Sequence, residues 1–252
     1  MSRRRRLDAE LLRRGLVASR TQATEAIEAA RVLVNGAIAD KSSRQVDPAD
    51  AIVIEGPPPR FVSRGGEKLD AALVAYNIRV DGLRVLDAGA STGGFSDCLL
   101  QRGAAHVVAL DVGHGQLHPR IRLDNRVLVM ERVNVRDVEP LYIGGPVDMV
   151  VADLSFISLT RVIPALVRSC VAGAPLVLLV KPQFEAGRQE VSKVKGVIVD
   201  PVVHDRVKAE IVVALEASGC VVRGWIDSPL TGADGNREFL VYATTAEEGS
   251  LS

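Results

Sequence analysis

Four ionisable residues stand beside predicted elements of regular structure, where they could do chemistry. Lys181 directly follows an apolar run, Asp153 follows another, and Glu238 directly precedes a third. Lys68 falls in the first turn of a helix predicted over 67–76, where a cation opposes the helix dipole and so does not serve helix stability. Amines and carboxyl groups at such positions could orient a substrate and help it to lose a proton. Taken singly, Lys68 could equally be a surface lysine and Asp153 a loop acid.

The stretch VLDAGASTGGF at 85–95 predicts a strand, a glycine-rich turn and the start of a helix. Glycines allow a ligand to approach the backbone, and a helix start offers free N–H groups to it. A dinucleotide-binding motif that begins at Gly89 would require glycine at its third position, but Ser91 stands there. A different nucleotide-like cofactor is therefore favoured. The alternative is a turn of this shape that binds nothing. The candidate cofactor residues here are Asp87, Gly89, Ser91, Thr92, Gly93, Gly94 and Phe95.

Strands and helices alternate from residue 84 onwards, which is typical of an α/β fold with a doubly wound parallel sheet. Strands are expected over 84–88, 106–111, 127–130, 147–152 and 176–180, followed by a hairpin of 220–226 and 239–244. Helices are expected over 67–76, 95–102, 159–171 and 201–218. Ligands of such sheets lie at the carboxyl ends of the strands. Asp111 ends the second strand and could meet ribose hydroxyls, and Asn134 follows the third and could meet an adenine edge.

The first 35 residues carry eight arginines against four acids, although the whole chain has a formal net charge of +0. They predict helices over 7–14 and 19–30, with Ser19 as N-cap, and then a hairpin over 32–38 that turns at Asn35-Gly36. This pattern over residues 4–55 resembles the RNA-binding domain of small-subunit ribosomal protein S-four. The alternative is a packing module with a solvated basic face. The resemblance implies RNA contacts from Arg5, Arg6, Arg13, Arg14 and Arg20.

Composition limits the remaining possibilities. The three cysteines, Cys98, Cys170 and Cys220, show neither metal-ligand spacing nor a disulfide framework. No apolar run is long enough to span a bilayer, and no signal peptide is evident. We therefore expect a cytoplasmic protein without a metal site or a membrane anchor.

The motifs together resemble the TlyA family, which joins an S-four-type domain to an FtsJ-like methyltransferase. They are VSRGGEKL at 62–69, LDAGASTGGF at 86–95, ADLSFIS at 152–158 and LVKPQFE at 179–185. The resemblance implies a Rossmann-like S-adenosylmethionine-dependent fold behind a small N-terminal α+β RNA-binding domain. It divides the chain into residues 1–56, a linker at 57–65 and a methyltransferase domain at 66–252.

The resemblance also implies an activity: 2′-O-methylation of cytidine ribose in 16S and 23S ribosomal RNA, with ribosomal subunits as partners and a monomeric enzyme. Lys68, Asp153, Lys181 and Glu238 would form its catalytic tetrad, with Asp153 also at the cofactor. Lys181 would contact the ribose hydroxyl, either as a general base or as an electrostatic orienter. A sulfonium is already a strong methyl donor, so this mechanism calls for no metal.

Three residues beside the proline-rich linker, Arg60, Phe61 and Arg64, are predicted RNA contacts that pass a signal between the two parts; a plain tether is the alternative. Some members of the family were first described as haemolysins. A membrane-active haemolysin and a non-catalytic RNA-binding protein are therefore the alternative functions.

Overall fold

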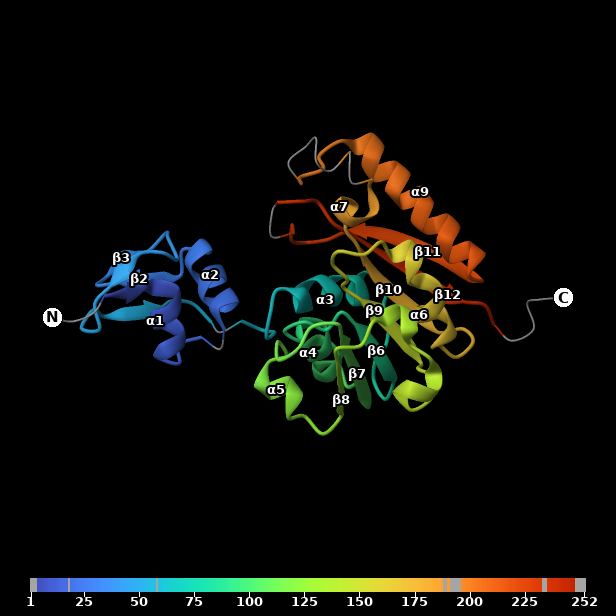
Figure 1. Cartoon of the computed structure of the whole chain (residues 1–252), viewed down its shortest axis with the longest axis horizontal. Helices are drawn as coiled ribbons and strands as arrows, with labels where there is room; N and C mark the ends of the chain where they lie inside the picture. The colour runs from blue at the N-terminus through green and yellow to red at the C-terminus, as the bar shows by residue number, and fades with distance from the viewer. Residues whose placement is uncertain are drawn as a thin grey trace. The chain divides into compact units, whose positions relative to one another are not determined.

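The computed structural model describes residues 4–17, 19–57, 59–187, 190, 196–232 and 235–247 of the 252-residue chain. The chain forms two compact units, Met1–Arg60 and Phe61–Ser252 (Figure 1). Phe61 and Val62, which the sequence placed in the linker, are buried in the second unit's core. The second unit therefore begins before residue 66.

The first unit packs two helices against short strands. Its elements are β1 (Arg5–Arg6), α1 (Leu7–Arg13), α2 (Arg20–Glu28), β2 (Val32–Val34), β3 (Ala37–Ile38), β4 (Gln45–Val46) and β5 (Ile52–Ile54). Strand β1 pairs antiparallel with β4, and β2 is the centre of a three-stranded sheet of order β3-β2-β5. Leu7, Leu11 and Ile27 are almost fully buried in the core between these elements.

Two local predictions in this unit are confirmed. The Ser19 side chain accepts a hydrogen bond from Gln22 N at 3.1 Å, so Ser19 caps α2. Asn35 and Gly36 have φ values of 53° and 82°, which is the left-handed pair that a tight two-residue hairpin turn requires.

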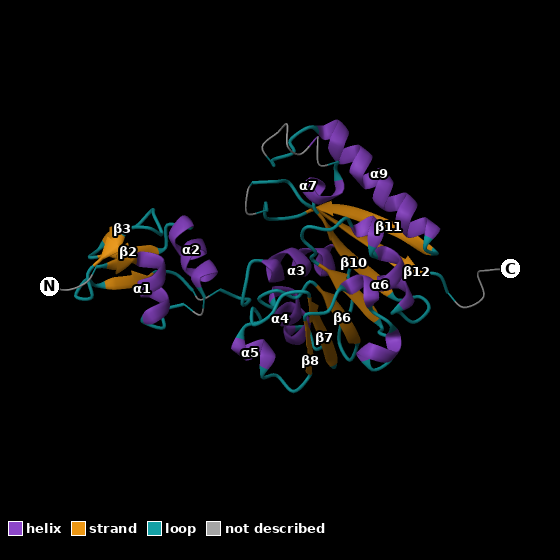
Figure 2. Ribbon diagram, viewed as in Figure 1, coloured by secondary structure: helices purple, strands orange, loops and turns teal. Residues whose placement is uncertain are grey.

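The second unit is built on a seven-stranded sheet of order β11-β12-β10-β9-β6-β7-β8 (Figure 2). The strands are β6 (Arg84–Ala88), β7 (His106–Asp111), β8 (Val127–Glu131), β9 (Met149–Ala152), β10 (Pro175–Val180), β11 (Cys220–Asp227) and β12 (Phe239–Thr245). The pairs from β8 to β10 are parallel, whereas β12 runs antiparallel to both β10 and β11. The strand order reverses between β6 and β9, and such a switch point is where doubly wound sheets bind ligands.

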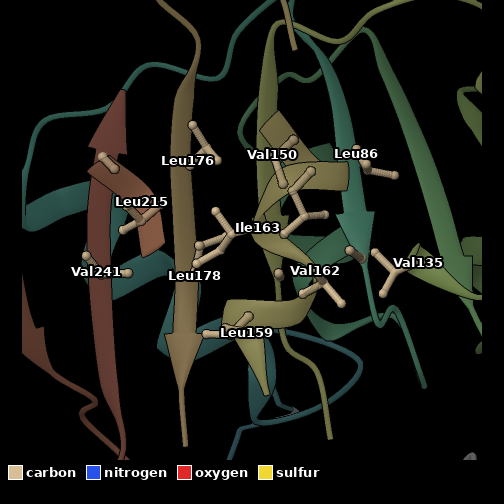
Figure 3. Packing of buried hydrophobic residues seen from close by; sticks show 14 of the residues in the cluster. Leu86, Val135, Val150, Leu159, Val162, Ile163, Leu176, Leu178, Leu215 and Val241 are labelled. Atoms are coloured by element: carbon tan, nitrogen blue, oxygen red, sulfur yellow. The ribbon is translucent and has the colours of Figure 1, made fainter. Parts of the chain in front are cut away.

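Helices cover both faces of this sheet. They are α3 (Gly65–Ala75), α4 (Gly94–Gln101), α5 (Pro119–Arg122), α6 (Ile163–Arg168), α7 (Pro182–Glu185) and α9 (Pro201–Ala217), with 3-10 turns η1 (Val135–Asp137), η2 (Pro140–Ile143) and η3 (Leu159–Arg161). Because side chains alternate along a strand, Leu86 and Val85 enter different cores. Leu86 belongs to the core on the face that η3, α6 and α9 cover, and Figure 3 shows Leu159, Ile163 and Leu215 of these elements in the same cluster. Val85 packs with α3 and α4 on the other face.

The single helix predicted over 159–171 is wrong. The structure has the turn η3 and then the separate helix α6. Pro164 lacks an N–H group and lies in the first turn of α6, where that donor is not needed. The proline therefore starts a new helix rather than continuing one.

Candidate active site

The sheet brings three of the four predicted catalytic residues to one edge. Ala152 pairs with Leu178 and Val180 pairs with Phe239, so the residues just beyond these pairs are neighbours. Asp153 follows β9 and Lys181 follows β10, whereas Glu238 precedes β12 because that strand runs the other way. All three therefore lie where the parallel strands end.

The fourth residue, Lys68, comes from helix α3. The start of this helix is held by close contacts at glycines: a Cβ on Gly66 would overlap the Phe61 side chain, and one on Gly94 would overlap Ser63 Oγ. A Cβ on Gly65 would lie 3.8 Å from Asp153 Oδ2, so the first turn of α3 lies beside the β9 end. Lys68 follows in that turn and reaches the same edge.

The four side chains form two ion pairs. Lys68 Nζ lies 2.5 Å from Glu238 Oε2, and Lys181 Nζ lies 2.5 Å from Asp153 Oδ1. Lys181 Nζ also donates a hydrogen bond to Ser155 Oγ at 3.0 Å. The Glu238 side chain is 2% exposed and those of both lysines 11%, whereas Asp153 is 24% exposed. One pair is thus deeply buried, and the other opens toward solvent on its acidic side.

A cavity of about 570 Å³ opens beside the second pair. This volume is within the range of small-molecule sites. Five of the predicted cofactor residues belong to its lining: Gly89, Ser91, Asp111, Asn134 and Asp153. The cavity lies at the switch point of the sheet, between the ends of β6 and β9.

Hydrogen bonds hold the polar groups of this cavity in place. Asp111 accepts from Ser91 N at 2.8 Å and from Gly113 N at 2.6 Å, so its carboxylate is fixed at the end of β7. Asn134 Oδ1 accepts from Arg136 N at 3.1 Å and caps η1. A carboxylate and an amide presented in a pocket of this size fit a nucleoside, whose sugar hydroxyls and base edge need such partners.

The other predicted cofactor residues are outside the cavity lining. Gly93 and Gly94 allow close packing within the protein, because a Cβ on Gly93 would lie 3.0 Å from Leu117 Cδ1 and one on Gly94 would overlap Ser63. Phe95 is buried in the core, and the Thr92 carbonyl accepts from His118 N. These four residues build the turn, while Gly89 and Ser91 face the cavity. Even Gly89 is needed for packing, since a Cβ there would lie 2.5 Å from the Asp153 carbonyl oxygen.

Asp87 is fully buried beneath this turn. Its Oδ2 accepts from Ser96 Oγ at 2.6 Å. Burial raises the pKa of Asp87 to about 7, although the Ser96 hydrogen bond opposes this, and nearby Asp153 adds to the rise. The side chain joins β6 to α4 rather than lining the cavity.

The predicted RNA-binding arginines of the first unit differ in their surroundings. Arg5 and Arg20 are exposed. Arg6 pairs with Asp8, and Arg13 pairs with the buried Glu10 through two hydrogen bonds. These two keep half-exposed side chains.

Two other predicted RNA contacts, Arg14 and Phe61, have partners within the protein. Arg14 binds Glu10 Oε1 at 2.8 Å and also donates to the carbonyl oxygens of Asp47, Pro48 and Asp50. Its guanidinium therefore ties α1 to the 47–50 turn. Phe61 is only 3% exposed and packs over Gly66, so its ring supports α3 instead of facing RNA. Arg60 and Arg64 on either side of it are exposed.

Sequence reasoning did not single out three residues of this site. Ser155 contacts Lys181, Phe156 lines the cavity, and Glu185 receives hydrogen bonds from the loop after β9. Each lies within four residues of a tetrad member along the chain. Their closeness in sequence to the predicted catalytic residues was the feature that could have identified them.

The comparisons with known proteins agree with this geometry. Residues 61–245 match the FtsJ-like methyltransferase family, and residues 5–52 match the S4 domain. The chain is 49% identical over 253 residues to the 16S/23S rRNA (cytidine-2′-O)-methyltransferase TlyA of Mycobacterium tuberculosis, covering 100% of this chain and 94% of that protein. The chain belongs to the TlyA family.

Other TlyA relatives carry a different name. Hemolysin A of Brachyspira hyodysenteriae is 38% identical over 239 residues, which cover 94% of this chain and 98% of that protein. A solved structure described as a hemolysin from Streptococcus thermophilus has a TM-score of 0.77 and 37% identity, and covers 100% of this chain and 94% of that one. Membership of the FtsJ-like family makes this chain a methyltransferase that uses S-adenosylmethionine.

Two further properties of the described residues concern membranes and metal ions. None of the helices in the described ranges has the length and apolar character needed to cross a membrane. Within the same residues, histidine, cysteine and acidic side chains do not gather in groups of three that could hold a metal ion.

Proposed function

We propose that this chain transfers the methyl group of S-adenosylmethionine to ribose 2′-hydroxyls of cytidines in 16S and 23S ribosomal RNA. Similarity to the enzyme of that name over the whole chain supports the substrate. One structural observation supports the chemistry: Asp153 lines the cavity and is also the ion-pair partner of Lys181. Asp153 thus links the cavity, where the cofactor would bind, to the amine of Lys181.

The tetrad would act on the acceptor. When bound, the cofactor supplies a methyl group already activated on a sulfonium, so the protein must place the hydroxyl in line and help it to lose its proton. Well-oriented placement alone can contribute ~7–11 kcal/mol. Lys181 contacts two residues of the cavity wall, Asp153 and Ser155, which would hold it toward the ribose hydroxyl. Lys68 and Glu238 would fix the opposite side of the acceptor site.

The cavity would hold the donor. Asp111 would bind the ribose hydroxyls, Asn134 the adenine edge, and Gly89 and Ser91 the methionine part. Asp87, Thr92, Gly93, Gly94 and Phe95 would contribute by shaping the turn.

The first unit would bind the RNA. Arg5, Arg6, Arg13 and Arg20 present guanidinium groups that suit phosphates, and such contacts add affinity with little sequence information. Arg60 and Arg64, which lie near the point where the chain passes from the first unit to the second, would add further contacts to RNA. Because all four tetrad residues come from one chain, we propose that a monomer acts on ribosomal subunits, and hence in the cytoplasm.

Methyl transfer from labelled S-adenosylmethionine to isolated 30S and 50S subunits, followed by mapping of the modified sugars, tests the proposal. We expect 2′-O-methylcytidine in both RNAs. Lys181→Ala should reduce turnover by at least about 10²-fold, the scale of acid–base or positioning groups, while cofactor affinity stays within a few-fold. Arg168→Ala, at the far end of α6, is the surface control and should leave turnover unchanged. Wild-type turnover by Lys181→Ala would refute the role, and unmodified cytidines in both RNAs would refute the function.

A further inference from the structure

The two segments that carry Asp153 and Lys181 are joined by more than the pair itself. The loop after β9 covers residues 153–158, and α7 follows Lys181 directly. Beyond the paired strands, side chains connect them: Lys181 reaches Asp153 and Ser155, and Glu185 at the end of α7 reaches back to the other end of the loop.

Glu185 uses both carboxylate oxygens on this loop. Oε2 accepts from Ser158 Oγ at 2.5 Å, and Oε1 accepts from Leu159 N at 2.9 Å. Ser158 is the N-cap of η3, and its Oγ also accepts from Thr160 N. The first N–H groups of a helical turn have no partner inside the turn, so the carboxylate completes this cap. Burial raises the pKa of Glu185, against the two hydrogen bonds, so the protein keeps an acid where solvation is poor.

The loop between these anchors is strained. Phe156 has φ 65°, a left-handed conformation that is rare for residues with a side chain. Such a conformation persists only when the flanking residues are held. Asp153 N donates to the Ala88 carbonyl at 3.0 Å at one end of the loop, and Glu185 holds the other end. The position of Ser155, midway between, depends on both anchors.

We propose that Glu185 is a positioning residue for methyl transfer. It fixes the loop after β9 so that Asp153 and Ser155 hold the Lys181 ammonium toward the acceptor hydroxyl. Glu185 itself does not touch substrate or cofactor. This inference rests on the proposed function, because it assigns Glu185 to the acceptor side of the same site.

The test uses full-length Glu185→Gln with ribosomal subunits as acceptor. The amide keeps the shape but loses the charge and one acceptor, so the loop should shift relative to Lys181. A misplacement of about 1 Å can cost about 10²-fold in rate. We therefore expect kcat to fall about 10- to 100-fold, with KM for RNA and Kd for S-adenosylmethionine within about 3-fold and an unchanged melting temperature. Glu210→Gln is the matched control, since Glu210 is near enough to raise the pKa of Glu185 but pairs with Arg206 on α9.

A double-mutant cycle separates positioning from general damage. Ser158→Ala removes one partner of the carboxylate and should lower kcat less than Glu185→Gln does. The double variant should be no slower than Glu185→Gln alone, because both changes break the same anchor. If Glu185→Gln proves unstable, kcat and KM are compared between Ser158→Ala and the wild-type enzyme instead. Wild-type kcat in both single variants, or fully additive losses, would overturn the positioning role. Failure of the wild-type enzyme to methylate RNA would instead overturn the proposed function.

Discussion

The Lys68 ammonium lies 2.5 Å from the Glu238 carboxylate, although 170 residues separate the two along the chain. Helix α3 supplies the first group, and the residue just before β12 supplies the second. Both side chains are almost excluded from solvent. A buried pair of this kind is weak evidence for stability, because desolvation offsets much of the attraction. Its presence at the strand ends therefore favours a role in the chemistry.

Removing one partner should separate stability from activity. We expect Lys68→Met to lower the free energy of unfolding by about 3–5 kcal/mol, because it leaves the Glu238 carboxylate buried without a cation. The double variant Lys68→Met/Glu238→Met should recover most of this loss. Neither should transfer methyl groups. Denaturant unfolding and the labelled-methyl assay measure the two properties, and an active double variant would remove the pair from the mechanism.

Asp111 should control cofactor affinity. Its carboxylate holds Ser91 and Gly113 at the cavity wall, and hydrogen bonds to charged groups contribute about 1.5–3 kcal/mol. Asp111→Ala is therefore expected to raise the Kd for S-adenosylmethionine at least about tenfold by calorimetry. Asp124→Ala, whose carboxylate pairs with Arg126 outside the cavity, should bind as the wild type does. Equal affinities of the two variants would exclude Asp111 from the site.

Asp87 should make stability fall as the pH rises. Its pKa is about 7 in the fold against an ordinary 3.8, so between these values the folded protein keeps a proton that the unfolded chain has lost. The free energy of unfolding then decreases across this window, by up to about 4 kcal/mol in total. Asp87→Asn cannot ionise and should gain stability relative to the wild type from pH 4 to pH 7. The exposed substitution Asp137→Asn should not, and parallel pH profiles for Asp87→Asn and wild type would contradict the assignment.

The arginines of the first unit should separate into two kinds. Arg5→Ala and Arg20→Ala should each weaken RNA binding and reduce the slope of log K against log salt by about 0.7–0.9, the effect of one lost phosphate contact. Arg14→Ala should leave that slope unchanged. It should instead speed hydrogen exchange in α1, because Arg14 joins Glu10 to the 47–50 turn. A reduced salt slope for Arg14→Ala would show that it contacts phosphate after all.

Most of the second unit's sheet could be predicted because its strands are continuous apolar runs. The expected strand 106–111 agrees with β7, and the hairpin of the last two strands is confirmed. Strands β1 and β4 were missed, since two residues are too few to show an alternating pattern. Asp153, Lys181 and Glu238 could be singled out because each adjoins an apolar run, and Lys68 because it is a cation in the first turn of a helix.

The glycine-rich turn shows what the sequence could not separate. A glycine that admits a ligand and one that admits another helix look alike along the chain. Gly89 lines the cavity, whereas position 94 has no room for a side chain because Ser63 lies against it. Phe61 was misjudged for a related reason: a proline-rich neighbourhood suggested an exposed linker, but the missing side chain of Gly66 makes room for the ring. These contacts join segments that no local pattern connects.

The reversed direction of β12 has a consequence for how acceptor access can change. The other strands of the site leave the sheet at the tetrad, but β12 enters it there, directly after the connection from β11. Gly232 lies against Glu238, where an added Cβ would be 2.7 Å from Oε1. A longer or shorter connection between these two strands would therefore change the surroundings of Glu238 while every strand keeps its register. Under the proposed function, such a change would alter the acceptor side of the site and leave the residues that line the 570 Å³ cavity unchanged.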